Sequence, residues 1–233
     1  MDTTISQSEK NYECQFCKRS FTKEKTLTAH VCEPKRRHQQ RDEKHVQIAY
    51  IAYKRFYELT QGSSNFKTYE HFAQSQYYNA FVKFGNHIIN INVINPDYFI
   101  DYVIKANKKL DHWCKDAIYE EYLLPYIKTE NVRDALERSI ITMEKWATDN
   151  NAQFNHFFKF VSFNKAVSLI RNGKISPWTI YNCKTGMEML EKMTDEQLGL
   201  INDFIDPIYW SKRFEAFVSD VEWVKHILSD AKM

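Results

Sequence analysis

Two cysteines, a histidine and a third cysteine lie close together near the start of the sequence, and their spacing constrains the first domain. Cys14 and Cys17 are separated by two residues, so both thiols can lie on one tight turn, and His30 and Cys32 follow in the same short segment. Zinc takes four sulfur or nitrogen ligands in a tetrahedron. The spacing therefore predicts a zinc site built from these four side chains.

Three apolar residues around the ligands can supply a miniature core. Tyr12 precedes the cysteines, and Phe21 and Leu27 lie between them and the histidine. Together with Cys14, Cys17 and His30 they resemble a single C2H2-type zinc finger, with the spacing aromatic-x-Cys-x2-Cys-x3-Phe-x5-Leu-x2-His and a cysteine as the last ligand. The resemblance covers residues 11 to 33, and it implies a ββα module that binds Zn²⁺.

The fourth ligand departs from the spacing of that family, which would place it at positions 34 to 36, where no residue can bind zinc. Cys32 and His38 are the two alternatives. On a continuous helix residues 30 and 32 are rotated by about 200°, so both could not face one ion. Pro34 disfavours helical backbone at the residue before it. We therefore expect the helix to end just after His30, which favours Cys32 over His38.

Basic residues are concentrated beside this segment. Residues 10 to 41 hold nine Lys and Arg and three Glu, whereas residues 48 to 233 hold 22 Lys and Arg and 23 Asp and Glu. A polyanion would be attracted to the basic part. In the resemblance, Lys23 and Lys25 occupy base-reading positions of the finger helix. The predicted nucleic-acid contacts are Lys23, Lys25, Lys35, Arg36, Arg37 and Arg41.

One finger reads about 3 base pairs, and the sequence holds no second copy of the pattern. The leading hypothesis is therefore a nucleic-acid-binding accessory protein with little sequence specificity, and DNA is favoured over RNA as its ligand. The alternative is a protein-docking or virion-assembly protein whose finger is structural and binds no nucleic acid.

The rest of the chain is predicted to be helical. Gly and Pro number only 5 each among 233 residues, and apolar residues recur at helical spacing. The prediction is a mostly α protein, with a zinc finger at residues 1–34, a stiff basic linker at 35–45 and an all-α domain at 46–233. Asn150 and Asn151 interrupt the pattern, so a subdivision near residue 150 is possible.

Local signals place several helix ends. One helix is expected from Thr68 to about Asn90, and another is expected to break or kink near Pro125. The expected N-terminal signals are Asn95-Pro96, Thr129, Ser176-Pro177, Thr194 with Gln197 as a capping box, and Asp206-Pro207, which would open a last long helix to about Leu228.

The helical domain carries no strong sign of catalysis. It has no Gly-rich phosphate loop, no GxSxG and no HExxH, and its histidines and carboxylates such as Glu120 lack catalytic spacing. We expect no enzyme and no small-molecule substrate. Residues 166–183 have helix-turn-helix proportions, with Trp178, Thr179 and Tyr181 on the second helix, although such aromatic residues are more often core. The surplus of Tyr and Trp favours a protein partner for this domain.

The sequence also indicates a compartment. The first residues have no apolar core typical of a signal peptide, and no apolar run is long enough for a membrane span. Five cysteines, three of them clustered, fit a metal site better than a disulfide framework. We expect a cytoplasmic, non-secreted protein without membrane contact. The whole chain resembles proteins of large tailed phages of marine bacteria, which would place it in the host cytoplasm, and this resemblance implies no function or site residue.

Overall fold

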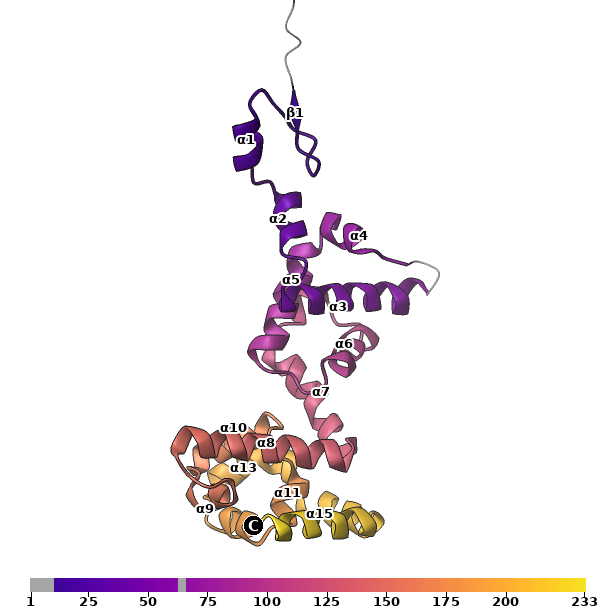
Figure 1. The fold of residues 1–233 in the computed structure, drawn as a ribbon. Coiled ribbons are helices and arrows are strands. Elements are labelled where there is room, and N and C mark those ends of the chain that lie inside the picture. The colour runs from indigo at the N-terminus through magenta and orange to yellow at the C-terminus, as the bar shows by residue number, and fades with distance from the viewer. Residues whose placement is uncertain (1–10, 63–65) are drawn as a thin grey trace, which may run out of the picture. The chain divides into compact units, whose positions relative to one another are not determined.

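The computed structural model describes residues 11–62 and 66–233, and nearly all of its regular structure is helical. A two-stranded antiparallel sheet precedes the helices, as the sequence predicts. The contacts divide the chain into two units, one that ends at Lys115 and one that begins at Asp116 (Figure 1). The interruption that the sequence shows at residue 150 is the end of a helix, where Asn151 takes the left-handed backbone conformation with φ 50°.

The first unit begins with strands β1 and β2, in which Tyr12 pairs with Phe21 and Glu13 with Ser20. Short helices and then longer ones follow. The elements of this unit are β1 (Tyr12–Glu13), β2 (Ser20–Phe21), α1 (Glu24–Ala29), α2 (Glu33–Gln39), α3 (Lys44–Gln61), α4 (Tyr69–Gln74), α5 (Tyr78–Asn90), α6 (Pro96–Lys105) and the 3-10 helix η1 (Leu110–His112).

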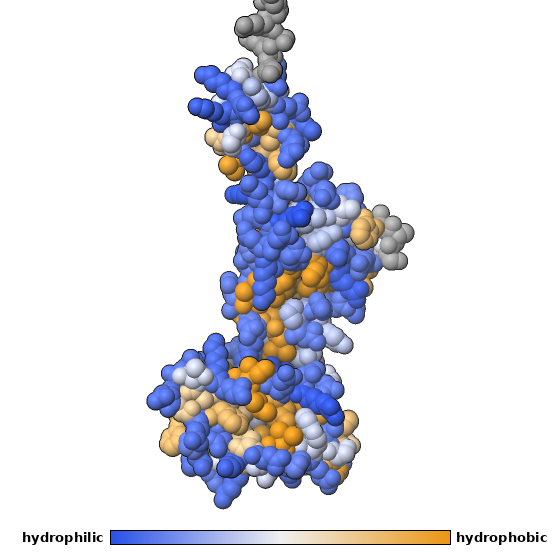
Figure 2. Space-filling model, in the orientation of Figure 1, coloured by the Kyte–Doolittle hydropathy of each residue, from blue (hydrophilic) through white to orange (hydrophobic). Residues whose placement is uncertain are grey.

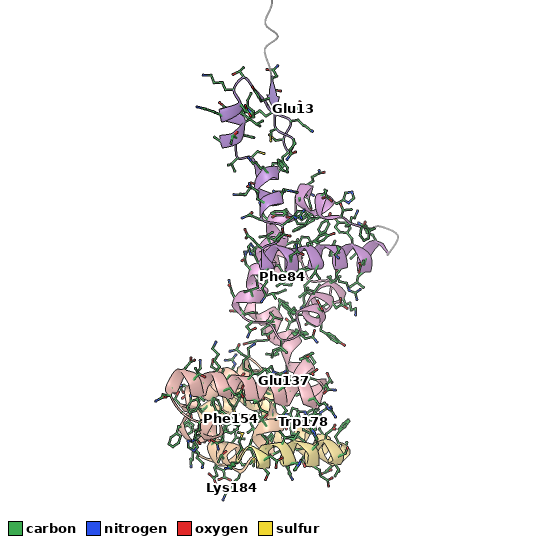
Figure 3. The ribbon with its side chains drawn as sticks, in the orientation of Figure 1. Glu13, Phe84, Glu137, Phe154, Trp178 and Lys184 are labelled. Atoms are coloured by element: carbon green, nitrogen blue, oxygen red, sulfur yellow. The ribbon has the colours of Figure 1, made fainter. Side chains whose placement is uncertain are left out.

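Helices α3 and α5 form the core of the first unit. Gly85 lets them approach closely, since a Cβ added there would lie 2.1 Å from a backbone carbonyl oxygen of α3. Trp113 is fully buried and packs edge-on against Phe81 and Phe84 at centroid distances of 5.7 and 5.0 Å. Figure 3 shows Phe84 on α5, among the side chains of this core. The apolar side chains that recur at helical spacing in α3 and α5 are thus buried inside the first unit.

The helix expected from Thr68 to Asn90 is instead two helices, so this prediction is wrong. Thr68 caps α4 in a capping box with His71, and α4 ends at Gln74. Ser75 is extended, with ψ 139°, and α5 begins at Tyr78. A residue far away in the sequence forms hydrogen bonds at this break: Arg37 on α2 donates to the backbone oxygens of Ala73 and Ser75. The sequence around position 75 carries no sign of that contact.

The second unit is helical throughout. Its elements are α7 (Asp116–Thr129), α8 (Val132–Asn150), the 3-10 helix η2 (Phe154–His156), α9 (Phe157–Phe160), α10 (Phe163–Arg171), α11 (Pro177–Tyr181), α12 (Lys184–Glu191), α13 (Asp195–Ile205), α14 (Pro207–Ala216) and α15 (Val218–Asp230).

Most of the predicted caps are confirmed. The side chains of Asn95, Ser176 and Asp206 accept hydrogen bonds from backbone N–H groups of α6, α11 and α14, and Thr194 forms the predicted capping box with Gln197. Each cap satisfies N–H groups that have no partner within the helix.

Two predictions on helix ends are wrong, those for Thr129 and for the last helix. Thr129 does not cap a helix: it ends α7, and the side chain of Asn131 caps α8 instead. Pro125 lies inside α7 and does not end it, and Thr129 donates to the carbonyl oxygen of Pro125 at 3.0 Å. The last helix is interrupted at Phe217, whose backbone leaves the helical region between α14 and α15. Local competition among polar residues decides these ends.

Aromatic residues fill the core of the second unit. Trp178 and Trp210 are almost fully buried, with ring centroids 6.0 Å apart, and Phe214 packs on both. In the first unit Tyr53 and Tyr78 are buried as well. Much of the aromatic surplus that favoured a protein interface is therefore core. Across residues 11–62 and 66–233, no helix combines the length and apolar character that crossing a membrane requires.

Candidate metal centre

The β1–β2 hairpin positions the first two thiols. The backbone N–H of Cys14 donates to the oxygen of Arg19 at 2.9 Å, and the N–H of Lys18 donates back to the oxygen of Cys14 at 2.8 Å. Lys18 closes this turn in the left-handed region, with φ 60°. The tight turn brings Cys14 and Cys17 to one side of the hairpin, which is the arrangement that a shared metal ion requires.

The end of α1 positions the other two ligands. Helix α1 ends at Ala29, and His30 is extended, with φ −70° and ψ 122°, as the sequence predicts. Cys32 is also extended, with φ −112° and ψ 162°, and it precedes α2. The expected cause, that Pro34 keeps Glu33 out of helical backbone, is wrong, because Glu33 is helical and Pro34 occupies the first turn of α2. The chain reverses at residues 30–32, before the proline, and a proline is tolerated in a first helical turn.

The four predicted ligands meet at one point. The ligand atoms of Cys14, Cys17, His30 and Cys32 all lie within 4.8 Å of one another. The Sγ atoms of Cys14 and Cys32 are 3.9 Å apart, and Cys17 Sγ lies 3.2 Å from His30 Nε2. Zinc–sulfur bonds of about 2.3 Å in a tetrahedron require sulfur atoms about 3.8 Å apart. This cluster can hold a metal ion, and no disulfide links its cysteines.

The hairpin also favours the charged form of one ligand. The backbone N–H of Cys17 donates to the Cys14 sulfur and lowers the pKa of Cys14 to about 7. Burial instead raises the pKa of the Cys32 thiol. Metal ions bind thiolates, so binding an ion at this cluster would release protons.

His38, the alternative fourth ligand, lies outside the cluster. Its ring packs against Phe16 with a centroid distance of 5.1 Å. The predicted miniature core is present, since Phe21 packs on the ring of His30 at 4.7 Å and Tyr12 and Leu27 are half-buried. The packed Phe21 ring holds the His30 imidazole toward the thiols.

The predicted nucleic-acid contacts fall into two groups. Lys23 and Lys25, at the start of α1, are exposed. Arg36 and Arg41 are exposed, but both form ion pairs. Arg36 pairs with Glu33 at 2.5 Å, and Arg41 pairs with Asp42 at 3.4 Å. Exposed pairs of this kind contribute little to stability, so a phosphate could compete for these guanidinium groups.

Two other predicted contacts are engaged within the protein. Lys35 Nζ donates to the backbone oxygen of His30 at 3.0 Å. The Arg37 side chain is only 16% exposed and lies 4.3 Å from the ring centroid of Tyr78, in addition to its hydrogen bonds to the α4 terminus. The hydroxyl of Tyr69 donates to the backbone oxygen of Arg37 at 2.5 Å. The contacts of Arg37 attach α2, and with it Cys32, to the helices that follow.

The structure of the second unit contradicts the alternative that residues 166–183 form a DNA-reading helix-turn-helix. Trp178 and Thr179 on α11 are fully buried, and the hydroxyl of Tyr181 donates to the backbone oxygen of Ile205. A helix with this burial cannot lie in a DNA groove. The two isolated cysteines are packed thiols, as expected: Cys183 is buried, and burial raises the pKa of Cys114.

Sequence reasoning missed a buried ion pair in the second unit. The Glu130 side chain is fully buried and accepts two hydrogen bonds of 2.7 Å from Arg138. Arg138 also donates to the backbone oxygen of Gly173 at 2.6 Å. Burial raises the pKa of Glu130. The two residues are eight positions apart, and nothing in the local sequence marks them as partners.

No protein-family model, no curated protein and no solved structure matches the chain. The likeness to a zinc finger therefore depends on the ligand spacing, on the small hairpin followed by a helix, and on the convergence of the four ligand atoms. The resemblance to phage proteins has no comparable basis.

Proposed function

We propose that the chain binds Zn²⁺ through Cys14, Cys17, His30 and Cys32 and that this finger contacts nucleic acid with little sequence specificity. The convergence of four ligand atoms within 4.8 Å carries the proposal. Three thiolates and one imidazole at tetrahedral spacing favour zinc over the harder Mg²⁺ and Ca²⁺, which prefer oxygen ligands.

The surface of the finger fits a polyanion. Lys18, Arg19, Lys23 and Lys25 are exposed on the hairpin and on the start of α1. Figure 2 shows hydrophilic residues over much of this part of the chain. Such side chains neutralise phosphates without reading bases, and a lone finger offers few base contacts. DNA is the proposed ligand of this face.

A salt series tests this function. With Lys23, Lys25, Arg36 and Arg41 each neutralising one phosphate, the logarithm of duplex affinity should fall with the logarithm of salt concentration at a slope of about −4. The zinc-loaded chain is titrated into labelled duplex DNA and duplex RNA. No binding to either at low salt would refute the proposal.

A charge-reversal pair separates the finger from general electrostatics. The Lys23→Glu/Lys25→Glu variant should weaken duplex binding and make the salt slope shallower by about 2. The matched control is Lys212→Glu/Lys225→Glu, which makes the same charge change on exposed lysines of α14 and α15. Equal losses in both variants would show that net charge, and not the finger, determines binding.

The second candidate function is protein docking, and exposed apolar residues of the second unit favour it. Apolar side chains in this unit with more than half of their surface exposed are Ile141, Phe160, Leu200, Ile208 and Val218. Figure 2 shows apolar residues on the visible face of this unit. Exposed apolar groups of this kind are common at protein interfaces. In this version the finger is structural and the chain binds no nucleic acid at any salt concentration.

A further inference from the structure

One face of α3 carries alternating tyrosines and lysines. Tyr50, Lys54 and Tyr57 lie four and three residues apart, so they share one side of the helix. All three are half-buried, and this side flanks the stripe that α3 buries against α5. The face is distinct from the metal centre, although both lie in the first unit.

An extended segment runs along this face and completes it. The hydroxyl of Tyr50 donates to the backbone oxygen of Lys67 at 3.0 Å. The Lys67 ammonium lies 4.6 Å from the ring centroid of Tyr57, and the Lys54 ammonium lies 4.9 Å from that of Tyr50. Phe66, next to Lys67, is 76% exposed. These five residues, Tyr50, Lys54, Tyr57, Phe66 and Lys67, are called the tyrosine–lysine face below.

The cations of this face have fixed positions. An ammonium group over an aromatic ring is attracted to the electron-rich ring face. Tyr50 and Tyr57 are seven residues apart on a helix, so their Cα atoms are separated by about 10 Å along α3. That separation corresponds to about three nucleotide steps of a stacked strand. Two positive charges fixed over these two rings suit a chain of phosphates.

The face continues toward the turn that follows α2. The ring of Tyr69 meets that of Tyr50 edge-on at 5.6 Å, and the charges of both Arg41 and Asp42 act on the Tyr69 hydroxyl. Two carboxylates bear on this face: Glu58 pairs with Arg55 at 3.4 Å, and the charge of Glu70 acts on the Tyr50 hydroxyl. A phosphate chain bound at Arg41 could therefore extend onto the tyrosine–lysine face.

We propose that the tyrosine–lysine face binds single-stranded nucleic acid, with phosphates at Lys54 and Lys67 and a base stacked on Phe66. An exposed aromatic ring beside fixed cations is the combination that single-strand binding uses. A protein partner would be expected to cover an apolar surface, whereas here lysines cover the tyrosine rings. The inference rests on the proposed function only in taking nucleic acid as the ligand.

Phe66 gives the sharpest test. The zinc-loaded chain is titrated with a short labelled oligothymidylate and, separately, with a labelled duplex. The Phe66→Ala variant should bind the oligothymidylate about 5- to 100-fold more weakly, since it loses one stacked base, and should bind the duplex unchanged. Phe66→Trp should restore single-strand binding. Unchanged single-strand affinity in Phe66→Ala would overturn the proposal.

A charge-reversal pair tests the two lysines. Lys54→Glu/Lys67→Glu should weaken single-strand binding and make its salt slope shallower by about 1.4. The control is again Lys212→Glu/Lys225→Glu. Cross-linking of a bromouridine-substituted strand should label the peptide that contains Phe66. Labelling only elsewhere, or losses equal to those of the control, would overturn the assignment.

The outcomes separate this inference from the proposed function. If the oligothymidylate binds in a Phe66-dependent way while the duplex does not bind, the finger proposal fails and the tyrosine–lysine face stands. If the duplex binds and depends on Lys23 and Lys25 while Phe66→Ala has no effect on the single strand, the opposite holds. If the chain binds neither probe, both proposals fail.

Discussion

Replacing Cys32 by alanine should remove one of the four proposed zinc ligands and little else. Structural zinc sites contribute about 10–16 kcal/mol of binding free energy, or about 2.5–4 kcal/mol for each of four ligands. The variant should therefore bind Zn²⁺ about two to three orders of magnitude more weakly. The Cys32 side chain makes no capping hydrogen bond to α2, so the loss of a cap adds little to this figure.

Competition with a chelator of known affinity measures the change, and Co²⁺ substitution reports how many thiolates bind the ion. His38→Ala is the matched variant, because His38 contacts Phe16 and lies outside the ligand cluster. It should change the zinc affinity by less than about tenfold, the effect expected of a lost packing contact. A larger loss in His38→Ala than in Cys32→Ala would show that the fourth ligand has been misassigned.

Three further predictions concern stability and are measured by urea unfolding. Arg138→Met leaves Glu130 buried without its cation and should lower the free energy of unfolding by about 3–5 kcal/mol; a loss below about 1 kcal/mol would contradict the burial of the pair. Gly85→Ala should lower the free energy of unfolding by about 1–3 kcal/mol, because the added Cβ would overlap the backbone of α3. Gly199→Ala should raise it by about 0.5–1 kcal/mol, because a Cβ there meets nothing within 4 Å. Burial raises the pKa of Tyr53 to about 12, above the value of about 10 in the unfolded chain, so the folded state keeps a proton that the unfolded state loses. The free energy of unfolding should therefore fall as pH rises above about 10, and it should fall less in a Tyr53→Phe variant; an equal fall in that variant would contradict this.

Short-range signals in the sequence predicted several of the helix starts. Ser176 and Thr194 cap their helices because their side chains reach N–H groups only two or three residues ahead. Where several candidates compete within a few residues, this reasoning failed. Thr129 and Asn131 could both open α8, and Asn131 does so because Thr129 is still part of α7.

Contacts between residues far apart in the sequence could not be predicted from the sequence alone. The break between α4 and α5 coincides with hydrogen bonds from Arg37, which lies more than thirty residues earlier in the chain. The Glu130–Arg138 pair depends on how deeply both side chains are buried. Burial of that kind follows from the packing of several helices, and a single sequence does not reveal it.

The candidate metal centre was predictable because its ligands are local. Spacing alone identified Cys14, Cys17 and His30, and the expected end of α1 favoured Cys32. The same reasoning treated the basic residues after Cys32 as one group. It could not distinguish the exposed side chains from Arg37, which packs inside the protein.

Helix α2 has only seven residues, and a helix of this length does not hold its shape alone in water. It begins directly after a candidate metal ligand, Cys32, and hydrogen bonds from Arg37 attach it to the neighbouring helices. Losing the ion would release one of these two attachments. The bonds after Lys35 and Arg36 would then open to trypsin, so the protease should cut the metal-depleted chain at these two bonds, between its finger and its helices, faster than it cuts the metal-loaded chain there.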